Sequence, residues 1–264
     1  MLKTNFLTFV KIFVLFISFS NGFAQKKVLL DNFFNNEISS QTNQAYHYLW
    51  DDKTYSGFSE FGEIFKQHGA TLALLKNKPT CKTLKNVDIF IIVDPDHVKD
   101  AKTPNYMTQK TASTIARWVK GGGVLLLLTN DSSNCELAKF NLLSSQFGIT
   151  YNLDLNHPEL PGLDKNIRNF QSCAFSKLPN HFVFQGVSKI FLKEIASIIC
   201  QKPAKSVLTE NGKTFMAEST YGKGYVFAVG DPWLYNEYID HALLPADFQN
   251  KQAAINLVKL LLSK

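Results

Sequence analysis

Short apolar runs along the chain alternate with segments in which apolar residues recur at helical spacing. The run at 87–93 is continuous and rich in β-branched residues, which is typical of a strand buried on both faces. The helical segments end at glycines, and Thr108 is placed to cap one of them. The predicted strands of the first half are 28–30, 71–75, 87–93 and 124–128, and the predicted helices are 58–69, 108–121 and 136–147.

The second half of the chain begins with a polar, irregular stretch at about 151–185, which we interpret as an insertion. Apolar runs then return, and the last two flank a Gly-Lys-Gly turn that predicts an antiparallel hairpin. The runs are 187–195, 205–208, 215–218 and 225–229, and an amphipathic helix at 253–262 closes the chain. We therefore expect one α/β domain over 25–264, a three-layer sandwich around a mostly parallel sheet.

Composition supports a globular enzyme or binding protein and excludes several other classes. Hydrophobic residues make up 45% and charged residues 19% of the 264 residues, which is unlike a disordered, collagenous or coiled-coil chain. Lys and Arg number 28 against 22 acidic residues, but the basic residues are dispersed and only two are arginines. Without a basic cluster, we expect no nucleic-acid partner.

The first 24 residues resemble a secretory signal peptide. Lys3 and Lys11 flank an apolar start, 12–19 is the hydrophobic stretch, and Gly22-Phe23-Ala24 is a small-x-small cleavage signal. A membrane anchor is the alternative, but the apolar run is short for a span. We expect cleavage after Ala24 and a mature protein in the periplasm or outside the cell, with no membrane association.

Four cysteines lie far apart in the sequence, without metal-ligand spacing. In an oxidising compartment they could form one or two disulfides, or they could be buried free thiols; the sequence leaves both open. The cysteines are Cys81, Cys135, Cys173 and Cys200. The chain also lacks a zinc-binding helix motif and a Walker loop, so we expect neither a metal nor a cofactor.

Polar side chains follow four of the predicted strands at the point where each strand ends. In an open parallel α/β sheet, ligands bind outside the carboxyl ends of the strands. Turn and cap preferences of Asp and Asn explain any one cluster, but four together predict a shared crevice. The candidate residues are Asp31, Asn32, Asp94, Asn130, Asp131 and Asp231.

Aromatic and titratable residues lie next to these strand ends. His47 could act as a general acid or base, because histidine titrates near neutrality. Tyr48 and Tyr235 could donate protons, and Trp233 could form a platform for a sugar ring. Arg168, in the polar stretch, is the better of the two arginines for gripping an anionic group.

The stretch GDPWLYNEYID at 230–240 is the most specific of several segments that carry a resemblance to a known family. The other segments are VLLDNFFNNE, YHYLWDDKTYSGFSEFGEIFKQHGA, VDIFIIVDPD, WVKGGGVLLLLTND and NCELAKFN. Together they resemble the amidotransferase-like module of Bacteroidetes polysaccharide-degradation systems, which occurs alone or fused to unsaturated glucuronyl or rhamnogalacturonyl hydrolases, and the resemblance covers nearly all of the mature chain. It implies a class I glutamine-amidotransferase-like, flavodoxin-like fold.

True amidotransferases carry a nucleophilic cysteine on a tight elbow after a central strand. Here Thr129-Asn130-Asp131 occupies that place, and Cys135 follows without glycine flanks, so we expect no glutamine hydrolysis. A stand-alone member of this group resembles the ulvan oligosaccharide dehydratases. The resemblance implies a hydro-lyase that removes water from a non-reducing-end uronic acid, with an anionic oligosaccharide as its substrate. The 4,5-unsaturated product would pass to an unsaturated glucuronyl hydrolase.

Such a reaction needs a base, a group that stabilises a carboxylate, and an acid. The candidates are His47 or Asp31 as the base, Asn32, Asn130 or Arg168 at the carboxylate, and Tyr46, Tyr48 or Tyr235 as the acid. The alternative is a non-catalytic carbohydrate-binding module of the same degradation systems. A hydrolase is a weaker alternative, because no G-x-S-x-G nucleophile elbow is present.

Overall fold

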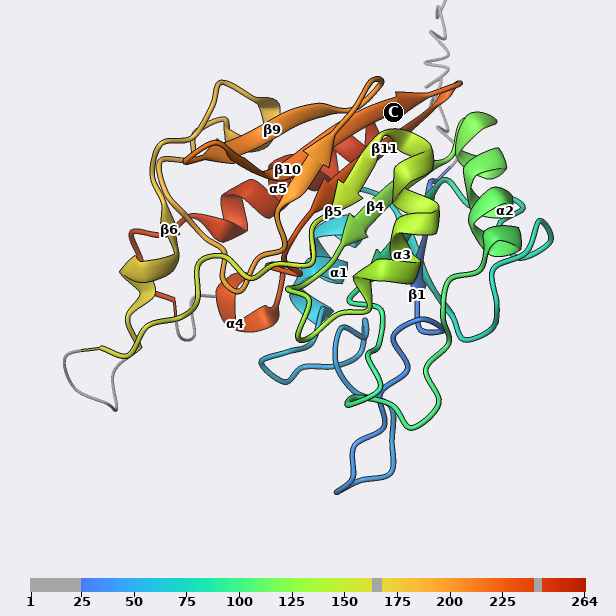
Figure 1. The fold of residues 1–264 in the computed structure, drawn as a ribbon, viewed down its shortest axis with the longest axis horizontal. Coiled ribbons are helices and arrows are strands. Elements are labelled where there is room, and N and C mark those ends of the chain that lie inside the picture. The colour runs from blue at the N-terminus through green and yellow to red at the C-terminus, as the bar shows by residue number, and fades with distance from the viewer. Residues whose placement is uncertain (1–24, 163–167, 240–243) are drawn as a thin grey trace, which may run out of the picture.

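A computed structural model describes residues 25–162, 168–239 and 244–264 (Figure 1). The predicted signal peptide lies outside the described residues, and its cleavage stays a prediction. The described part of the chain is a mixed α/β fold around a nine-stranded sheet that contains a five-stranded parallel half. None of its helices has both the length and the apolar composition needed to cross a membrane.

The parallel half of the sheet has the strand order β2-β1-β3-β4-β11, and an antiparallel half continues it through β10, which pairs with both β8 and β9, while β5 pairs with β8. The strands are β1 (Lys27–Asp31), β2 (Thr71–Leu75), β3 (Ile89–Val93), β4 (Val124–Leu128), β5 (Ile149–Tyr151), β8 (Ile198–Cys200), β9 (Lys205–Glu210), β10 (Lys213–Tyr221) and β11 (Gly224–Val229). β6 (Ala174–Phe175) and β7 (Ile190–Phe191) form a separate two-stranded sheet. The α/β prediction and the hairpin of β10 and β11 are confirmed.

Helices lie on both faces of the parallel half (Figure 1). They are α1 (Ser59–Gln67), α2 (Gln109–Lys120), α3 (Leu137–Ser144), the short α4 (Asn236–Ile239) and α5 (Asn250–Leu262). Thr108 caps α2 as predicted, because its hydroxyl accepts a hydrogen bond from the backbone N–H of Thr111 at 3.3 Å. A single turn of 3-10 helix follows α3 and ends at Gly148, whose φ of +78° is left-handed.

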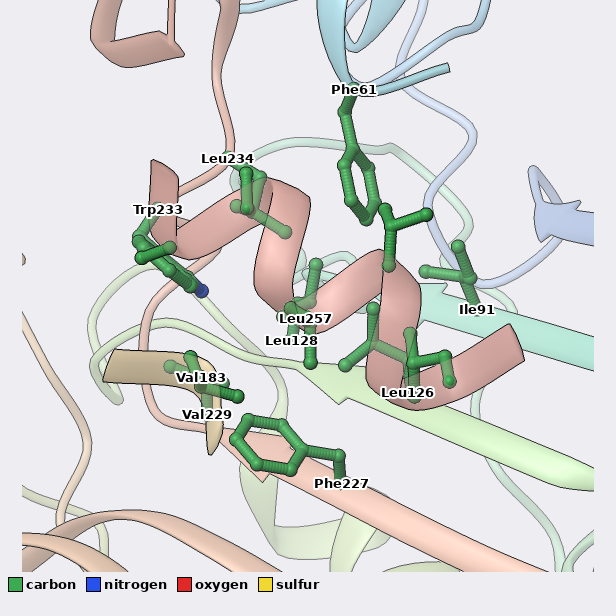
Figure 2. Packing of buried hydrophobic residues seen from close by; sticks show 14 of the residues in the cluster. Phe61, Ile91, Leu126, Leu128, Val183, Phe227, Val229, Trp233, Leu234 and Leu257 are labelled. Carbon is green, nitrogen blue, oxygen red and sulfur yellow. The ribbon is translucent and has the colours of Figure 1, made fainter. Parts of the chain in front are cut away.

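The central strands have hydrophobic side chains on both faces, because each face is covered. Alternate residues of β3 belong to different clusters: Ile89, Ile91 and Val93 pack with α1 and α5, whereas Phe90 and Ile92 pack with α2 and α3. Figure 2 shows the first cluster, in which Leu126 and Leu128 of β4 lie beside Leu257 of α5. The continuous apolar runs in the sequence follow from this double burial.

The strand order reverses between β1 and β3. The chain passes from β1 to its neighbour β2 and then crosses to the opposite side of β1, where β3 begins the series β3-β4-β11. At such a reversal the connections leave the sheet edge in opposite directions, and a crevice forms outside the carboxyl ends of the strands. The fold therefore favours a ligand site at the edge that bears Asp31, Asp94, Asn130 and Asp231.

Two parts of the second half differ from the sequence prediction. A strand was expected over 187–195, but only Ile190–Phe191 is a strand, because Glu194 has a left-handed backbone with φ of +52° that ends the extended run. The polar stretch at 151–185 also contributes to the core: Phe175, Val183 and Phe184 are all buried.

Asn236 joins its own segment to the loop before α1 and the start of that helix, which lie 176–184 residues earlier in the sequence. Its side-chain amide donates to the backbone carbonyls of Asp52 and Thr54 at 3.0 and 2.8 Å, and its side-chain oxygen accepts from the backbone N–H of Glu60 at 2.9 Å. The last bond replaces the cap that α1 lacks, since Phe58 stands at the N-cap position and cannot accept a hydrogen bond. Asn236 therefore fixes the start of α1 and the loop before it.

We expect Asn236→Ala to lower the free energy of unfolding by about 1–3 kcal/mol, because it leaves several part-buried backbone groups without their side-chain partner. Urea unfolding followed by circular dichroism measures the change. Gln67→Ala, at an exposed position near the end of the same helix, is the control and should stay within about 0.5 kcal/mol of the wild type. Equal stability of the two variants would contradict the role of Asn236.

Candidate active site

A cavity of about 240 Å³ lies at the carboxyl edge of the parallel strands. Three of the four predicted strand ends line it, through Asp94 after β3, Asn130 after β4 and Asp231 after β11. The remaining lining residues come from loops and from the segment after β7: Glu37, His47, Tyr48, Asp100, Asn134, Lys193, Glu194 and Tyr235. The prediction that separate strand ends share one crevice therefore holds for these three strands.

Tyr48, Asp94 and Tyr235 form a buried hydrogen-bonded network in the wall of this cavity. The Tyr48 hydroxyl donates to Oδ2 of Asp94 at 2.6 Å and lies 3.2 Å from the Tyr235 hydroxyl. Burial raises the pKa of Asp94 to about 7, although the bond from Tyr48 opposes the shift. Burial also raises the pKa of Tyr48 well above its ordinary value. Near neutral pH the network therefore holds protons that it can donate.

His47 is oriented by a carboxylate. Its Nδ1 lies 3.2 Å from Oε1 of Glu37, and the imidazole packs against the Tyr46 ring at a tilt of 50°, with 3.9 Å between ring centroids. A carboxylate at Nδ1 favours the tautomer with the proton on that nitrogen, which leaves Nε2 with a free electron pair. The His47 side chain is 28% exposed, so a ligand in the cavity can reach it. The arrangement therefore suits a general base.

Lys193 brings a positive charge to the cavity. Its ammonium lies 3.4 Å from carboxylate oxygens of both Glu159 and Glu194, and its backbone N–H donates to Oδ2 of Asp231 at 2.8 Å. Burial lowers the pKa of Lys193, but the neighbouring acids Glu194, Glu159 and Asp231 outweigh it and hold this pKa above its ordinary value. Burial raises the pKa of Asp231 well above its usual range. Lys193 therefore stays charged beside a carboxyl whose ionisation burial disfavours.

Four residues that line the cavity have left-handed backbone conformations although none is a glycine. The φ angles are +63° at His47, +52° at Tyr48, +39° at Asp94 and +52° at Glu194. Non-glycine residues adopt this region rarely, at a cost of order 1–3 kcal/mol each, and such positions cluster at functional sites. Their concentration here is a second indication that this cavity is the functional site.

Asp31 and Asn32 do not line the cavity, contrary to our expectation for the end of β1. Oδ2 of Asp31 accepts the backbone N–H of Phe34 at 2.8 Å, and Asn32 donates to the backbone carbonyl of Asn35 at 2.9 Å. Burial raises the pKa of Asp31 to about 7. Both side chains hydrogen-bond backbone groups of the loop after β1. Asp31 therefore does not lie where a catalytic base would contact a ligand in the cavity.

Asp131 is buried and organises the turn after β4. Its Oδ1 accepts the backbone N–H of Ser133 at 2.7 Å, and its Oδ2 accepts from the Asn134 side chain. Trp233, which we predicted to contact a ligand, is a core residue with 0% exposure (Figure 2). Its indole packs in the cluster of α5 and β11 and cannot form an open platform for a sugar.

Arg168 is occupied by acids and lies outside the cavity lining. Its Nε and Nη2 donate to the two oxygens of Glu159 at 2.6 and 2.9 Å, and its Nη1 lies 3.4 Å from Glu237. Arg168 is therefore not placed to grip a carboxylate bound in the cavity. Arg168 and Lys193 share Glu159 as an ion-pair partner, but only Lys193 lines the cavity. The cation at the cavity is therefore a lysine and not the predicted arginine.

Sequence reasoning missed Lys193, Glu194 and Glu37. Lys193 and Glu194 were placed inside the predicted strand 187–195, where their side chains would point to opposite faces of the sheet and not into one cavity. A Lys-Glu pair after the apolar run Ile190–Leu192 was the available signal, but nothing local indicates the left-handed turn at Glu194. Glu37 lies in a polar loop without any recognisable pattern.

All four cysteines are free thiols in this structure, although the sequence left both disulfides and free thiols open. Burial raises the pKa of Cys135 well above its ordinary value, which disfavours a nucleophilic thiolate. Within the described residues, no three His, Cys, Asp or Glu side chains are grouped so that they could hold a metal ion.

Comparison with known proteins identifies similar folds. No protein-family model matches the sequence, and no curated protein does. The mmIFT52 N-terminal domain is similar with a TM-score of 0.66 at 14% identity, over 90% of this chain and 98% of that one. Two cytoplasmic proteins of Salmonella typhimurium are also similar. STM1381, from strain LT2, has a TM-score of 0.57 at 16% identity, over 90% and 99% of the two chains. STM3548 has a TM-score of 0.54 at 16% identity, over 89% and 98% of the two chains. At such identities the likeness concerns the fold alone.

The buried acids near the cavity make stability depend on pH. Asp96 is 3% exposed, its Oδ2 accepts the backbone N–H of Asn36 at 2.9 Å, and its Oδ1 has no partner. Burial raises the pKa of Asp96 from 3.8 to about 8. A raised folded-state pKa gives stability that is complete below pH 3.8 and is lost as the pH rises toward 8, because the unfolded chain ionises first.

We therefore expect Asp96→Asn to flatten the decline of the melting temperature between pH 4 and pH 8. Relative to the wild type, the variant should gain on the order of 10 °C over that range. Thermal unfolding across a pH series measures it, with Asp51→Asn, at an exposed loop position, as the control. Parallel curves for the wild type and Asp96→Asn would show that ionisation of Asp96 does not limit stability.

Proposed function

We propose that this chain is an exported hydro-lyase that removes water from the non-reducing-end uronic acid of ulvan-type oligosaccharides. The proposal rests on one constellation: His47 held by Glu37, Tyr48 bonded to Asp94, and Lys193, all lining one cavity. It agrees with the resemblance of the sequence to the amidotransferase-like modules of polysaccharide degradation. We propose the matching fold type, a three-layer sandwich of the class I glutamine-amidotransferase-like kind.

Each step of the dehydration has a candidate group. Nε2 of His47 takes the proton from C5, which is acidified by the adjacent carboxylate. The Lys193 ammonium stabilises the negative charge that develops on that carboxylate. The electron pair of the C5–H bond forms the C4–C5 double bond as the C4–O4 bond breaks. Tyr48 protonates the departing O4, so that it leaves as water, and Asp94 restores the proton of Tyr48.

Charge at the cavity is compatible with an anionic sugar despite the number of acids. Burial raises the pKa of Asp231 above its ordinary value and that of Asp94 to about 7, which weakens the repulsion that these two acids exert on a carboxylate. Lys193 is the cation that such a substrate would meet. The unsaturated product would be consumed by an unsaturated glucuronyl hydrolase, which we propose as the next enzyme of the pathway.

Saturated uronate–rhamnose oligosaccharides from ulvan test the reaction. Incubation with the purified mature protein should produce the ultraviolet absorbance of a conjugated enoate, and mass spectrometry should find the loss of one water. His47→Ala should reduce turnover by about 10²–10⁴-fold because it removes the base. His68→Ala, at the end of α1, is the matched histidine control and should retain activity.

Binding of the oligosaccharide without absorbance would overturn the hydro-lyase and support the alternative, a non-catalytic carbohydrate-binding module. Turnover that survives His47→Ala would remove His47 from the mechanism while leaving the reaction in place. Absence of both binding and turnover would reject this class of substrate.

The proton relay predicts a specific dependence on pH. If protonated Asp94 returns a proton to Tyr48, kcat/KM should fall as the pH rises through about 7, since that is where Asp94 loses its proton. Asp94→Asn removes the titrating group, so we expect a rate about 100-fold lower and no decline near pH 7. A decline at the same pH in both proteins would assign it to another group.

A further inference from the structure

A second cavity, of about 400 Å³, adjoins the first. The two share His47, Tyr48, Lys193 and Tyr235 as common walls. The second is completed by the loop before α1 and by the start of α4, through Thr54, Tyr55, Ser56, Glu237 and Tyr238. A ligand whose terminal unit occupies the first cavity therefore has its continuation directed into the second.

The lining of the second cavity has the chemistry of a sugar subsite. It offers the phenol rings of Tyr55 and Tyr235, the hydroxyls of Thr54 and Ser56, and the Glu237 carboxylate, while the ring of Tyr238 is buried behind them. Aromatic rings provide apolar faces for the C–H side of a sugar, and hydroxyls and carboxylates bond its hydroxyl groups. Glu237 faces Arg168 at 3.4 Å, so its negative charge is already compensated.

Tyr55 is exposed and yet lies on a fixed loop. Tyr55 is 58% exposed, which is more than any other aromatic residue that the structure describes. The loop is held from both ends: the backbone N–H of Tyr48 donates to Ser56 at 3.0 Å, and the backbone N–H of Glu237 donates to Tyr55 at 3.2 Å. Asn236 also bonds the carbonyl of Thr54 at 2.8 Å. A large exposed ring on a rigid loop loses little conformational freedom when it binds a ligand.

We propose that this second cavity is a subsite for the sugar next to the terminal uronate, with Tyr55 as its specificity-determining residue. The inference rests on the proposed function for the identity of the terminal unit. It assigns the protein a preference for oligosaccharides over the free uronic acid, because a monosaccharide fills only the first cavity.

Equilibrium binding tests the subsite separately from catalysis. Calorimetry or ligand-observed NMR compares a saturated uronate–rhamnose disaccharide with the free uronic acid on the mature protein, while absorbance is recorded independently. We expect the wild type to bind the disaccharide at least 10-fold more tightly. Tyr55→Ala should reduce this preference about 5–10-fold, and Tyr55→Phe should keep it, since the ring is retained. Phe182→Ala, at an exposed aromatic position that lines neither cavity, should leave the preference unchanged.

Equal binding of the two sugars by the wild type would overturn the subsite, and so would a preference that Tyr55→Ala does not alter. Both results hold whether or not the protein turns the sugar over. A preference that depends on Tyr55 without any absorbance would support the subsite and reject the hydro-lyase. Absence of binding by either sugar would overturn the subsite together with the substrate class.

Discussion

Burial of both faces of β3 and β4 is the constraint on which the rest of the molecule depends. Every residue of these strands is at most 1% exposed, so neither strand can carry a polar side chain along its length. Polar groups can only follow the last strand residue, where the backbone leaves the sheet. Because the strands are parallel, Asp94 and Asn130 emerge at the same edge. The hydrophobic effect that builds the core thereby also collects the polar groups of the cavity.

The same burial sets the electrostatics of the site. Carboxyl groups at the edge of a thick apolar core are poorly solvated, and this raises the pKa of Asp31 and Asp94 to about 7 and that of Asp96 to about 8. Such groups reduce stability near neutrality, as buried acids do. They also hold exchangeable protons in the pH range where an acid catalyst is useful. Stability and proton donation are therefore two consequences of one desolvated environment.

Long-range contacts complete the site from segments that the sheet does not position. His47 and Tyr48 lie on a loop with left-handed backbone, and Tyr48 reaches Asp94, 46 residues later. Asn236 bonds the neighbouring loop from 182 residues later in the chain, and Glu159 of the polar stretch, itself paired with Arg168, contacts Lys193. Each of these bonds joins segments that no local pattern connects.

Local sequence determined the strands of the parallel half, the capped helix α2, the hairpin and the position of Asp94, Asn130 and Asp231 directly after strands, because periodicity, caps and turns depend on near neighbours. It also identified His47, Tyr48 and Tyr235 as candidates. Only the tertiary structure decided which polar residues face the cavity. It buried Trp233 in the core, turned Asp31 and Asp131 toward backbone groups, neutralised Arg168 with Glu159 and brought Lys193 to the site. The orientation of a polar side chain depends on partners that are distant in the sequence, and no local pattern records them.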